Sequence, residues 1–265
     1  MTVRFSPDAA SPAPSSKQTS PHTPTECPVC HAQGAAFAFS KSGHDLYLCP
    51  ECDFLFVHPY PSAAAITAFY ETAYRGASAD FYPKSSSRRW RTWWRSLKFI
   101  RYVRHKDVLD LGCGGGFMAN AFSRLGARAT GLDISQNSIA FAKRHFPQCT
   151  FYCEELNTFR QRKLTFDFVF SSEVLEHVAG PDEFMQTLAA VTRPNGFVYI
   201  SAPDVGHPAV PADIPSWADI CPPEHLQFFN FRNLCFIFER YGFVLHKNIK
   251  NRTPAHSVIF RRKSG

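Results

Sequence analysis

The sequence lacks any run of about 18 apolar residues, the length that a membrane-spanning helix requires. Residues 1–7 also lack the apolar stretch of a secretion signal. Residues 1–24 contain few large apolar side chains and much Ser, Pro, Thr and Ala, so they cannot bury enough surface to offset chain entropy. We therefore expect a cytoplasmic protein with a disordered tail at residues 1–24.

Acidic residues are missing from residues 84–106, which contain nine Lys and Arg residues. The whole chain has 29 basic and 22 acidic residues and a formal net charge of +7. Without that one segment, the chain carries two more acidic than basic residues. Proteins that bind nucleic acid through its phosphates need a basic surface, so this distribution disfavours nucleic acid as the main partner.

Nine cysteines are an odd number, and four of them form two C-x-x-C pairs separated by 18 residues. The pairs are Cys27 with Cys30 and Cys49 with Cys52. This spacing is typical of a zinc ribbon, because each pair brings two thiolates on a tight turn to one tetrahedral ion. Four thiolates leave no open position for a substrate, so we expect a structural zinc at residues 25–61. The alternative is four reduced thiols without metal.

The pattern V-L-D-L-G-C-G-G-G-F at residues 108–117 is an apolar run that breaks into four glycines within five positions. The run suits a buried strand, and glycine allows the backbone to approach a ligand closely. A second apolar run ends at Asp133, 23 residues after Asp110, where a carboxylate would meet a ribose in a Rossmann-type site. The G-x-G-x-x-G spacing of dinucleotide sites is absent, which disfavours NAD. A Rossmann domain without ligand stays the alternative.

This D-x-G-x-G-G-G pattern resembles motif I of the class I S-adenosylmethionine (SAM) methyltransferases. In that family the residue matching Asp110 lies near the loop amides, and the residue matching Asp133 holds the ribose hydroxyls. The resemblance implies SAM as the cofactor. It implies the following binding residues: Asp110, Gly112, Cys113, Gly114, Gly116, Asp133, Ile134 and Ser172.

The downstream sequence resembles the ubiquinone-type O-methyltransferase branch. F-D-F-V-F at residues 166–170 predicts a fourth strand, E-V-L-E-H-V follows at residues 173–178, and P-N-G precedes an apolar strand. The resemblance covers residues 106–260 and implies a doubly wound α/β fold with a seven-stranded, mainly parallel Rossmann-like sheet in residues 107–265. Asn195 replaces the glycine of the family, and asparagine tolerates the left-handed turn conformation.

Residues 62–106 are predicted to form a linker and a basic amphipathic helix. The apolar residues with helical spacing are Trp90, Trp93, Trp94, Leu97, Ile100 and Val103, with arginines and lysines between them. Such a helix could bind a phosphate backbone, a membrane leaflet or a lipid-diphosphate-linked substrate. We expect instead that its tryptophans pack on the sheet, because an apolar helical stripe more often faces a core.

Glu173, Glu176 and His177 follow the fourth strand, where this fold brings the acceptor to the methyl group. If they begin a helix, they share one face. His225 lies in a later loop. The E-x-x-E-H pattern with a later His resembles ubiquinone-pathway O-methyltransferases and the enzymes that methylate the terminal 2′-hydroxyl of small RNAs. On that resemblance these four residues bind a second divalent cation, which would be magnesium, manganese or zinc.

A metal-free site is the other interpretation of the same residues. Glu173 and His177 would then line the pocket, and His225 would be a general base. Both interpretations make Glu173, His177 and His225 candidate catalytic residues of a SAM-dependent methyltransferase that acts on oxygen of a hydroxylated small molecule or sugar-linked metabolite. The alternatives are an RNA methyltransferase that uses the ribbon and the basic helix, and a non-catalytic SAM-binding scaffold. The sequence leaves the oligomeric state open.

Overall fold

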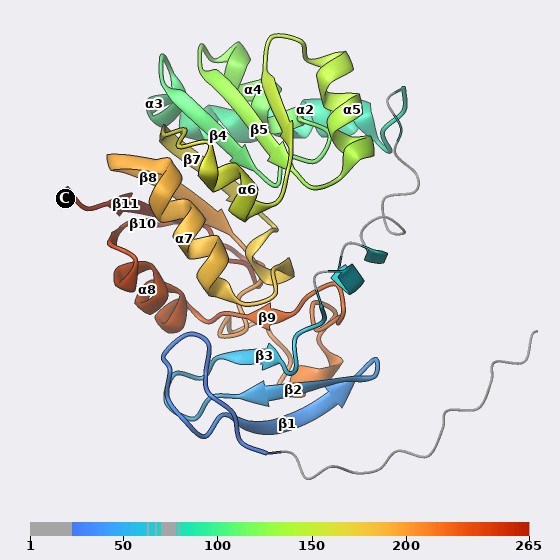
Figure 1. Cartoon of the computed structure of the whole chain (residues 1–265), viewed down its shortest axis with the longest axis vertical. Helices are drawn as coiled ribbons and strands as arrows, with labels where there is room; N and C mark the ends of the chain where they lie inside the picture. Colours follow the sequence, from blue (N-terminus) through green and yellow to red (C-terminus); the bar gives the residue numbers. More distant parts are fainter. Residues whose placement is uncertain (1–22, 63, 67, 70–77, 79, 265) are drawn as a thin grey trace, which may run out of the picture.

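The computed structural model describes residues 23–62, 64–66, 68, 69, 78 and 80–264, so most of the expected tail lies outside the described residues. These residues form two sheets (Figure 1). The larger sheet has the strand order β10-β11-β8-β7-β4-β5-β6, and the smaller has the order β1-β2-β3-β9. Over the part of the chain that the structure describes, no helix has the length and apolarity to cross a membrane.

The seven-stranded sheet is mainly parallel, which confirms the predicted Rossmann-like fold. Its parallel strands are β4 (Asp107–Leu111), β5 (Arg128–Asp133), β6 (Thr150–Cys153), β7 (Phe166–Ser172) and β8 (Thr192–Ser201). Two antiparallel strands, β10 (Phe243–Asn248) and β11 (Val258–Arg262), complete it next to β8, as expected. Asn195 has a φ of 62°, which confirms the left-handed turn.

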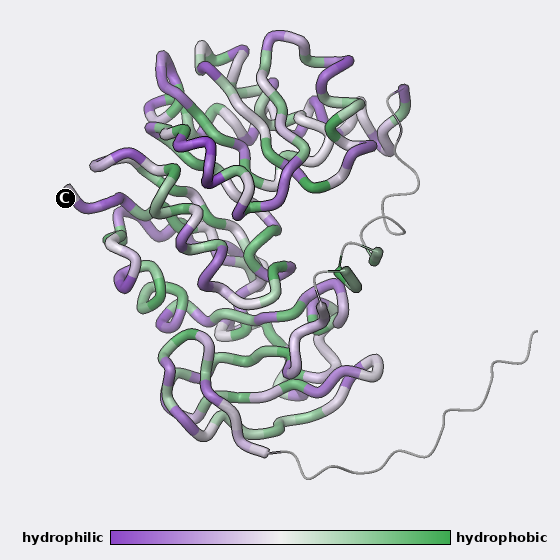
Figure 2. The backbone as a smooth tube through the Cα atoms, in the orientation of Figure 1, coloured by the Kyte–Doolittle hydropathy of each residue, from purple (hydrophilic) through white to green (hydrophobic). Residues whose placement is uncertain are grey.

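Helices cover both faces of this sheet. One face carries α2 (Ser85–Ser96), η1 (Leu97–Phe99), α3 (Ile100–Val103), α4 (Phe117–Arg124) and α5 (Gln136–His145). The other carries α6 (Leu156–Gln161), α7 (Pro181–Val191) and α8 (Phe231–Arg240). Neighbouring residues of β4 show why both faces are covered. Val108 packs against the side with α2 to α5 and Leu109 against the side with α6 to α8, because successive residues of a strand point to opposite faces. Figure 2 shows hydrophobic and hydrophilic residues alternating along α8, as expected of an amphipathic helix.

The predicted zinc ribbon forms a small antiparallel sheet. Its own strands are β1 (Ala36–Lys41), β2 (His44–Leu48) and β3 (Leu55–Val57), and the first two make the hairpin between the cysteine pairs. The fourth strand, β9 (Gln227–Phe228), comes from the C-terminal part of the chain and pairs with β3. β9 lies within residues 107–265, the expected range of the large domain, yet it belongs to the sheet of the ribbon. The predicted domain boundaries at residues 61 and 107 therefore stay a prediction.

The ribbon and the large sheet share one hydrophobic core. Phe54 is fully buried and packs on Phe229, with ring centroids 4.7 Å apart. Asn233 of α8 donates from Nδ2 to the carbonyl oxygen of Cys52 at 3.1 Å. The ribbon is thus packed against α8 and does not stand apart from the domain of the seven-stranded sheet.

The basic helix departs from expectation on one face. Trp90 is 67% exposed and Trp94 is 55% exposed, so the prediction that the tryptophans pack on the sheet is wrong for these two. Ser96, Phe99 and Val103 are buried instead. Ser96, Phe99 and Val103 follow one another at helical spacing and form the buried face. Trp94 lies about 200° around the helix from Ser96, on the opposite side.

The shared core predicts that the ribbon unfolds together with the large sheet. We expect Phe54→Ala to lower the free energy of unfolding by about 3–5 kcal/mol in a single transition, because it removes a buried ring between the two parts. Phe37→Ala, on the outer face of β1, is the control and should cost under about 1 kcal/mol. Urea unfolding followed by circular dichroism measures both. A separate early transition with an unchanged main transition would contradict the shared core.

Candidate active site

The glycine loop joins β4 to α4 at the carboxyl end of the parallel strands. Gly112 has a φ of 77°, and a Cβ atom there would lie 2.2 Å from Val174 Cγ2, so only glycine fits. Gly114 donates its amide hydrogen to Asp133 Oδ2 at 2.8 Å, and Ser135 donates to Asp133 Oδ1 at 2.9 Å. The carboxylate at the end of β5 therefore also fixes the loop.

The other residues predicted from motif I lie beneath the loop. Asp110 is 3% exposed, its Oδ2 accepts from the amide of Ala119 at 3.0 Å, and burial raises its pKa to about 7. A Cβ on Gly116 would lie 2.7 Å from the Phe151 ring, so this glycine permits close packing of α4. Cys113 is likewise buried in the core.

A pocket of about 260 Å³ opens beside this loop. It contains five of the predicted site residues, which are Gly112, Asp133, Ile134, Glu173 and His177. It is also lined by Glu154, Glu155 and Leu156, which directly follow β6. The sequence analysis did not identify these three residues. The available signal was a carboxylate directly after the third parallel strand, because the ends of parallel strands place such a residue at the same edge of the sheet as Asp133.

Two further residues reach the site from the segment before motif I. Tyr82 is 5% exposed and covers the glycine loop, since a Cβ on Gly115 would lie 2.8 Å from its ring. Arg95 of α2 donates to Ser172 Oγ at 3.0 Å and to Tyr199 Oη at 3.3 Å. The predicted residue Ser172 is thus held by a guanidinium group. The sequence placed Arg95 among solvent-exposed arginines, and nothing local distinguishes it.

The chain after β7 is not an α-helix. Glu173 has a φ of 57°, and η2 (Leu175–His177) is a short 3₁₀ helix. Glu173 donates its amide hydrogen to the Ser201 carbonyl oxygen at 2.8 Å, and its Oε1 accepts from Ser201 Oγ at 2.8 Å. The expected arrangement on one helical face is therefore wrong, because β8 binds Glu173 and turns the chain. The role of Glu173 as a metal ligand stays a prediction.

Glu176, His177 and His225 do come together, with ligand atoms within 4.8 Å of one another. Glu176 is 1% exposed, and neither carboxylate oxygen has a hydrogen-bond partner among the described residues. Burial, and next the charge of Glu173, raise the pKa of Glu176 well above its usual value. Nε2 of His177 lies 3.9 Å from Oε1 of Glu176. A buried carboxylate that accepts no hydrogen bond is costly, so this group is suited to a positively charged ligand.

Backbone carbonyls fix both imidazoles of this group. His177 donates from Nδ1 to the carbonyl oxygen of Glu224 at 2.7 Å, and His225 donates from Nδ1 to that of Asp219 at 2.7 Å. The hydrogen bonds assign the tautomer, so Nε2 is the atom that carries the lone pair when either ring is neutral. Burial lowers the pKa of His177 and so favours the neutral form. Such carbonyl-oriented imidazoles are typical of metal ligands.

Three hydrogen bonds hold the His225 loop against η2 and the ribbon. Leu226 donates its amide hydrogen to the Glu176 carbonyl oxygen at 2.7 Å, and Gln227 donates from Nε2 to that of Leu175 at 2.6 Å. Val57 of β3 donates to the Leu226 carbonyl oxygen at 2.8 Å. The ribbon thus contacts the backbone beside the proposed catalytic histidine.

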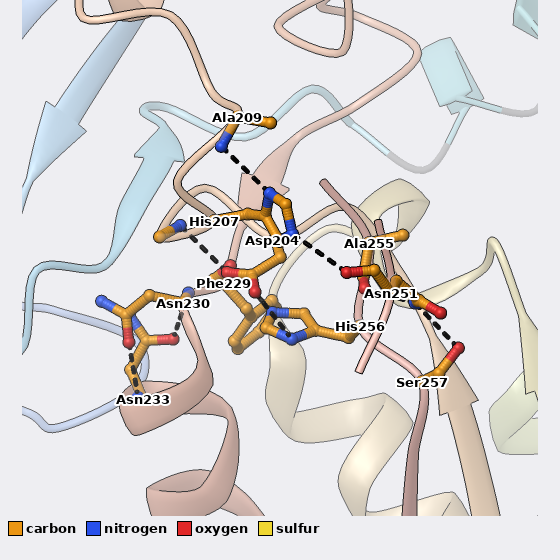
Figure 3. A network of polar contacts seen from close by, with 11 residues as sticks. Asp204, His207, Ala209, Phe229, Asn230, Asn233, Asn251, Ala255, His256 and Ser257 are labelled. Carbon is orange, nitrogen blue, oxygen red and sulfur yellow. Dashed lines mark hydrogen bonds and ion pairs between the residues drawn. The ribbon is translucent and has the colours of Figure 1, made fainter. Parts of the chain in front are cut away.

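A buried network holds the other end of β9 (Figure 3). His256 is 3% exposed and donates from Nε2 to the carbonyl oxygen of Phe229 at 3.0 Å. Its Nδ1 lies 3.6 Å from Asp204 Oδ2. This Asp–His pair faces a backbone carbonyl, so it supports the chain that follows His225 and is separate from the pocket.

The four predicted zinc ligands form a second group. Cys27 Sγ lies 3.7 Å from Cys52 Sγ, and Cys30 Sγ lies 3.5 Å from Cys49 Sγ. All four sulfur atoms lie within 4.8 Å of one another, which fits one tetrahedral ion. His31 is engaged elsewhere, because its ring nitrogens contact Glu26 and Arg240.

Comparison with known proteins shows a family match over most of the large sheet. A family model described as "Methyltransferase domain" matches residues 83–248, more than half of the chain. Ubiquinone biosynthesis O-methyltransferase of Coxiella burnetii is 34% identical over 112 residues, which cover 40% of this chain and 48% of that protein. The enzyme of the same name from Bradyrhizobium diazoefficiens is 38% identical over 114 residues, 39% of this chain and 45% of that protein.

The fold is similar to that of solved methyltransferases. A SAM-dependent methyltransferase from Mesorhizobium loti superposes with a TM-score of 0.55 at 19% identity, over 64% of this chain and 98% of that one. This likeness concerns the fold alone, and the chain spans about half the length of the curated relatives it matches. The family match and the seven-stranded sheet agree on one conclusion. The chain belongs to the methyltransferase domain family.

Proposed function

We propose that this protein transfers the methyl group of SAM to a hydroxyl oxygen of a small-molecule acceptor. The observation that carries the proposal is the group of Glu176, His177 and His225 beside the pocket that contains Gly112 and Asp133. An attacking hydroxyl group must lose its proton, and this group offers atoms that can assist its loss. The O-methyltransferase names of the two curated relatives support the same reaction.

The cofactor half of the site comprises the glycine loop and the ends of β5 and β6. The Asp133 carboxylate would bind the ribose hydroxyls while it also accepts from the Gly114 amide. Glu154 and Glu155 line the far wall of the same pocket. Arg95 would contribute a positive charge at the end of β7, next to Ser172. Backbone amides hold Asp133, Arg162 holds Glu154, and two hydroxyl groups hold Arg95, so these three side chains need little reorganisation on binding.

The acceptor half fits a divalent cation held by Glu176, His177 and His225. Glu176 supplies a buried carboxylate that accepts no hydrogen bond from the described residues, and the two histidines supply Nε2 lone pairs. A divalent cation at this position would lower the pKa of a hydroxyl group that it contacts. The carbonyl oxygens of Glu224 and Asp219 keep the imidazoles oriented for that purpose.

The metal-free alternative uses the same geometry differently. His225 would accept the hydroxyl proton at Nε2, and the Asp219 carbonyl oxygen would hold the imidazole in the required tautomer. The buried Glu176 would then stabilise the imidazolium that forms. The two mechanisms differ in whether Glu176 binds a cation, so they can be distinguished directly.

The first test of this proposal concerns the cofactor. We expect Asp133→Ala to weaken binding of S-adenosylhomocysteine by about 10- to 150-fold in calorimetry, because a charged diol contact is lost. Asp133→Asn keeps one oxygen for the Gly114 amide, so it should bind with intermediate affinity. Glu239→Gln, an exposed carboxylate on α8, is the control. Unchanged affinity in Asp133→Ala would exclude this residue from the cofactor site.

The second test concerns the reaction and the cation. Wild-type protein with methyl-labelled SAM should convert hydroxylated acceptors such as catechols and polyols to methyl ethers, identified by mass spectrometry. Manganese binding followed by electron paramagnetic resonance should weaken at least tenfold in Glu176→Gln and in His225→Ala, because each variant loses a ligand. Glu183→Gln, which is exposed in the same pocket, should bind as the wild type does.

The outcomes separate the two mechanisms. If the wild type stays active in the presence of a chelator, and only His225→Ala loses methyl-transfer activity, by about 10²- to 10⁴-fold, then His225 acts as a base without metal. Full activity of His225→Ala would remove both mechanisms. Methyl transfer that occurs only on amines or on RNA would contradict the proposal itself.

The ribbon is proposed to hold one structural zinc at Cys27, Cys30, Cys49 and Cys52. Elemental analysis should find about one zinc per wild-type chain and much less in Cys30→Ser, since a ligand is removed. The melting temperature should fall as well, because metal binding supplies folding free energy. Cys235→Ser, on α8 and outside the group, should keep its zinc. A full zinc equivalent in Cys30→Ser would contradict this ligand set.

A further inference from the structure

The outer face of α2 and α3 exposes tryptophan beside cations. Trp90 and Trp94 are 67% and 55% exposed, and their ring centroids lie 6.2 Å apart. Arg91, Lys98 and Arg101 are exposed as well. We call these five residues the tryptophan ridge. Trp90 and Trp94 lie one helical turn apart on α2, and Lys98 and Arg101 follow in η1 and α3.

The inner face of the same segment is already used by the fold. Ser96 and Phe99 are buried, and the guanidinium group of Arg95 lies over the Phe170 ring at 5.2 Å. Arg88 and Arg89 lie over the rings of Tyr82 and Phe146. By contrast, the three cations of the tryptophan ridge make no ion pair with any described residue, and residues 84–106 contain no acidic side chain.

The chemistry of this ridge fits a lipid surface. Tryptophan side chains combine a large apolar body with one polar N–H group and are enriched where membranes meet water. Exposed arginine and lysine are attracted to anionic headgroups. An amphipathic helix with both features typically lies in the interface with its aromatic residues inserted. We propose that the tryptophan ridge docks this protein on a bilayer that contains anionic phospholipid.

Docking would take place close to the catalytic pocket. Arg95, on the inner face of α2, donates to Ser172 at the end of β7, and Tyr82 covers the glycine loop just before α2. Phe81 is 61% exposed next to Tyr82, so it extends the apolar surface toward the pocket. The proposal goes beyond methyl transfer, because it concerns where the protein works and requires no particular acceptor.

Vesicle binding by the full, zinc-loaded chain tests the proposal. In flotation assays the wild type should bind vesicles of phosphatidylcholine with one quarter phosphatidylglycerol and should not bind pure phosphatidylcholine. Trp90→Ala with Trp94→Ala should weaken binding at least tenfold and abolish the blue shift of tryptophan fluorescence. Arg91→Gln with Lys98→Gln should weaken it by about fivefold for each charge. Rising salt should weaken binding further, because the charges are screened.

Matched controls separate the ridge from general charge and apolarity. Phe236→Ala removes an exposed ring from α8, and Arg252→Gln with Lys263→Gln removes two exposed charges elsewhere. Neither control should change vesicle binding. Thermal midpoints and S-adenosylhomocysteine affinity establish that every variant is folded, and the charge variant tests the proposal even if the tryptophan variant does not fold.

Three results would overturn the proposal. The first is no binding of the wild type to the anionic vesicles. The second is equal binding by wild type, tryptophan variant and charge variant. The third is tighter binding of single-stranded RNA than of vesicles at physiological salt, lost in the same variants, which would make the ridge a nucleic-acid surface.

Discussion

The pairing of β3 with β9 is the constraint on which the proposed acceptor half of the site depends. This short ladder joins a strand of the cysteine ribbon to a strand about 170 residues later in the chain. The next hydrogen bond, from Val57 to Leu226, fixes the backbone directly after His225. These contacts join the His225 loop to the ribbon, so the ribbon is part of the framework of the proposed site.

The site therefore has two halves with different origins. The cofactor half follows from the parallel sheet, because the carboxyl ends of β4, β5 and β6 place the glycine loop, Asp133 and Glu154 at one edge. The acceptor half comprises loops that the sheet alone does not fix. There, Glu176 and His177 come from the turn after β7 and meet a histidine supported by the ribbon and by His256.

The helix before the glycine loop contacts the large sheet on one face and solvent on the other. Its inner face sends Arg95 to the end of β7, while its outer face leaves Trp90 and Trp94 in solvent. Exposed tryptophans cost solubility, and a helix that only covered a sheet would gain from burying them.

Local sequence patterns determined the strands, the glycine turn at residues 112–116, the strand end at Asp133, the cysteine pairs and the left-handed turn at Asn195, because each depends on residues close together in the chain. The tertiary structure alone decided which residues meet. The β3 to β9 pairing, the bond from Ser201 that gives Glu173 its positive φ, and the place of Arg95 all depend on contacts between distant segments. Helical periodicity predicts a buried stripe, but which side of a wide stripe faces the sheet depends on how closely the neighbouring helix packs.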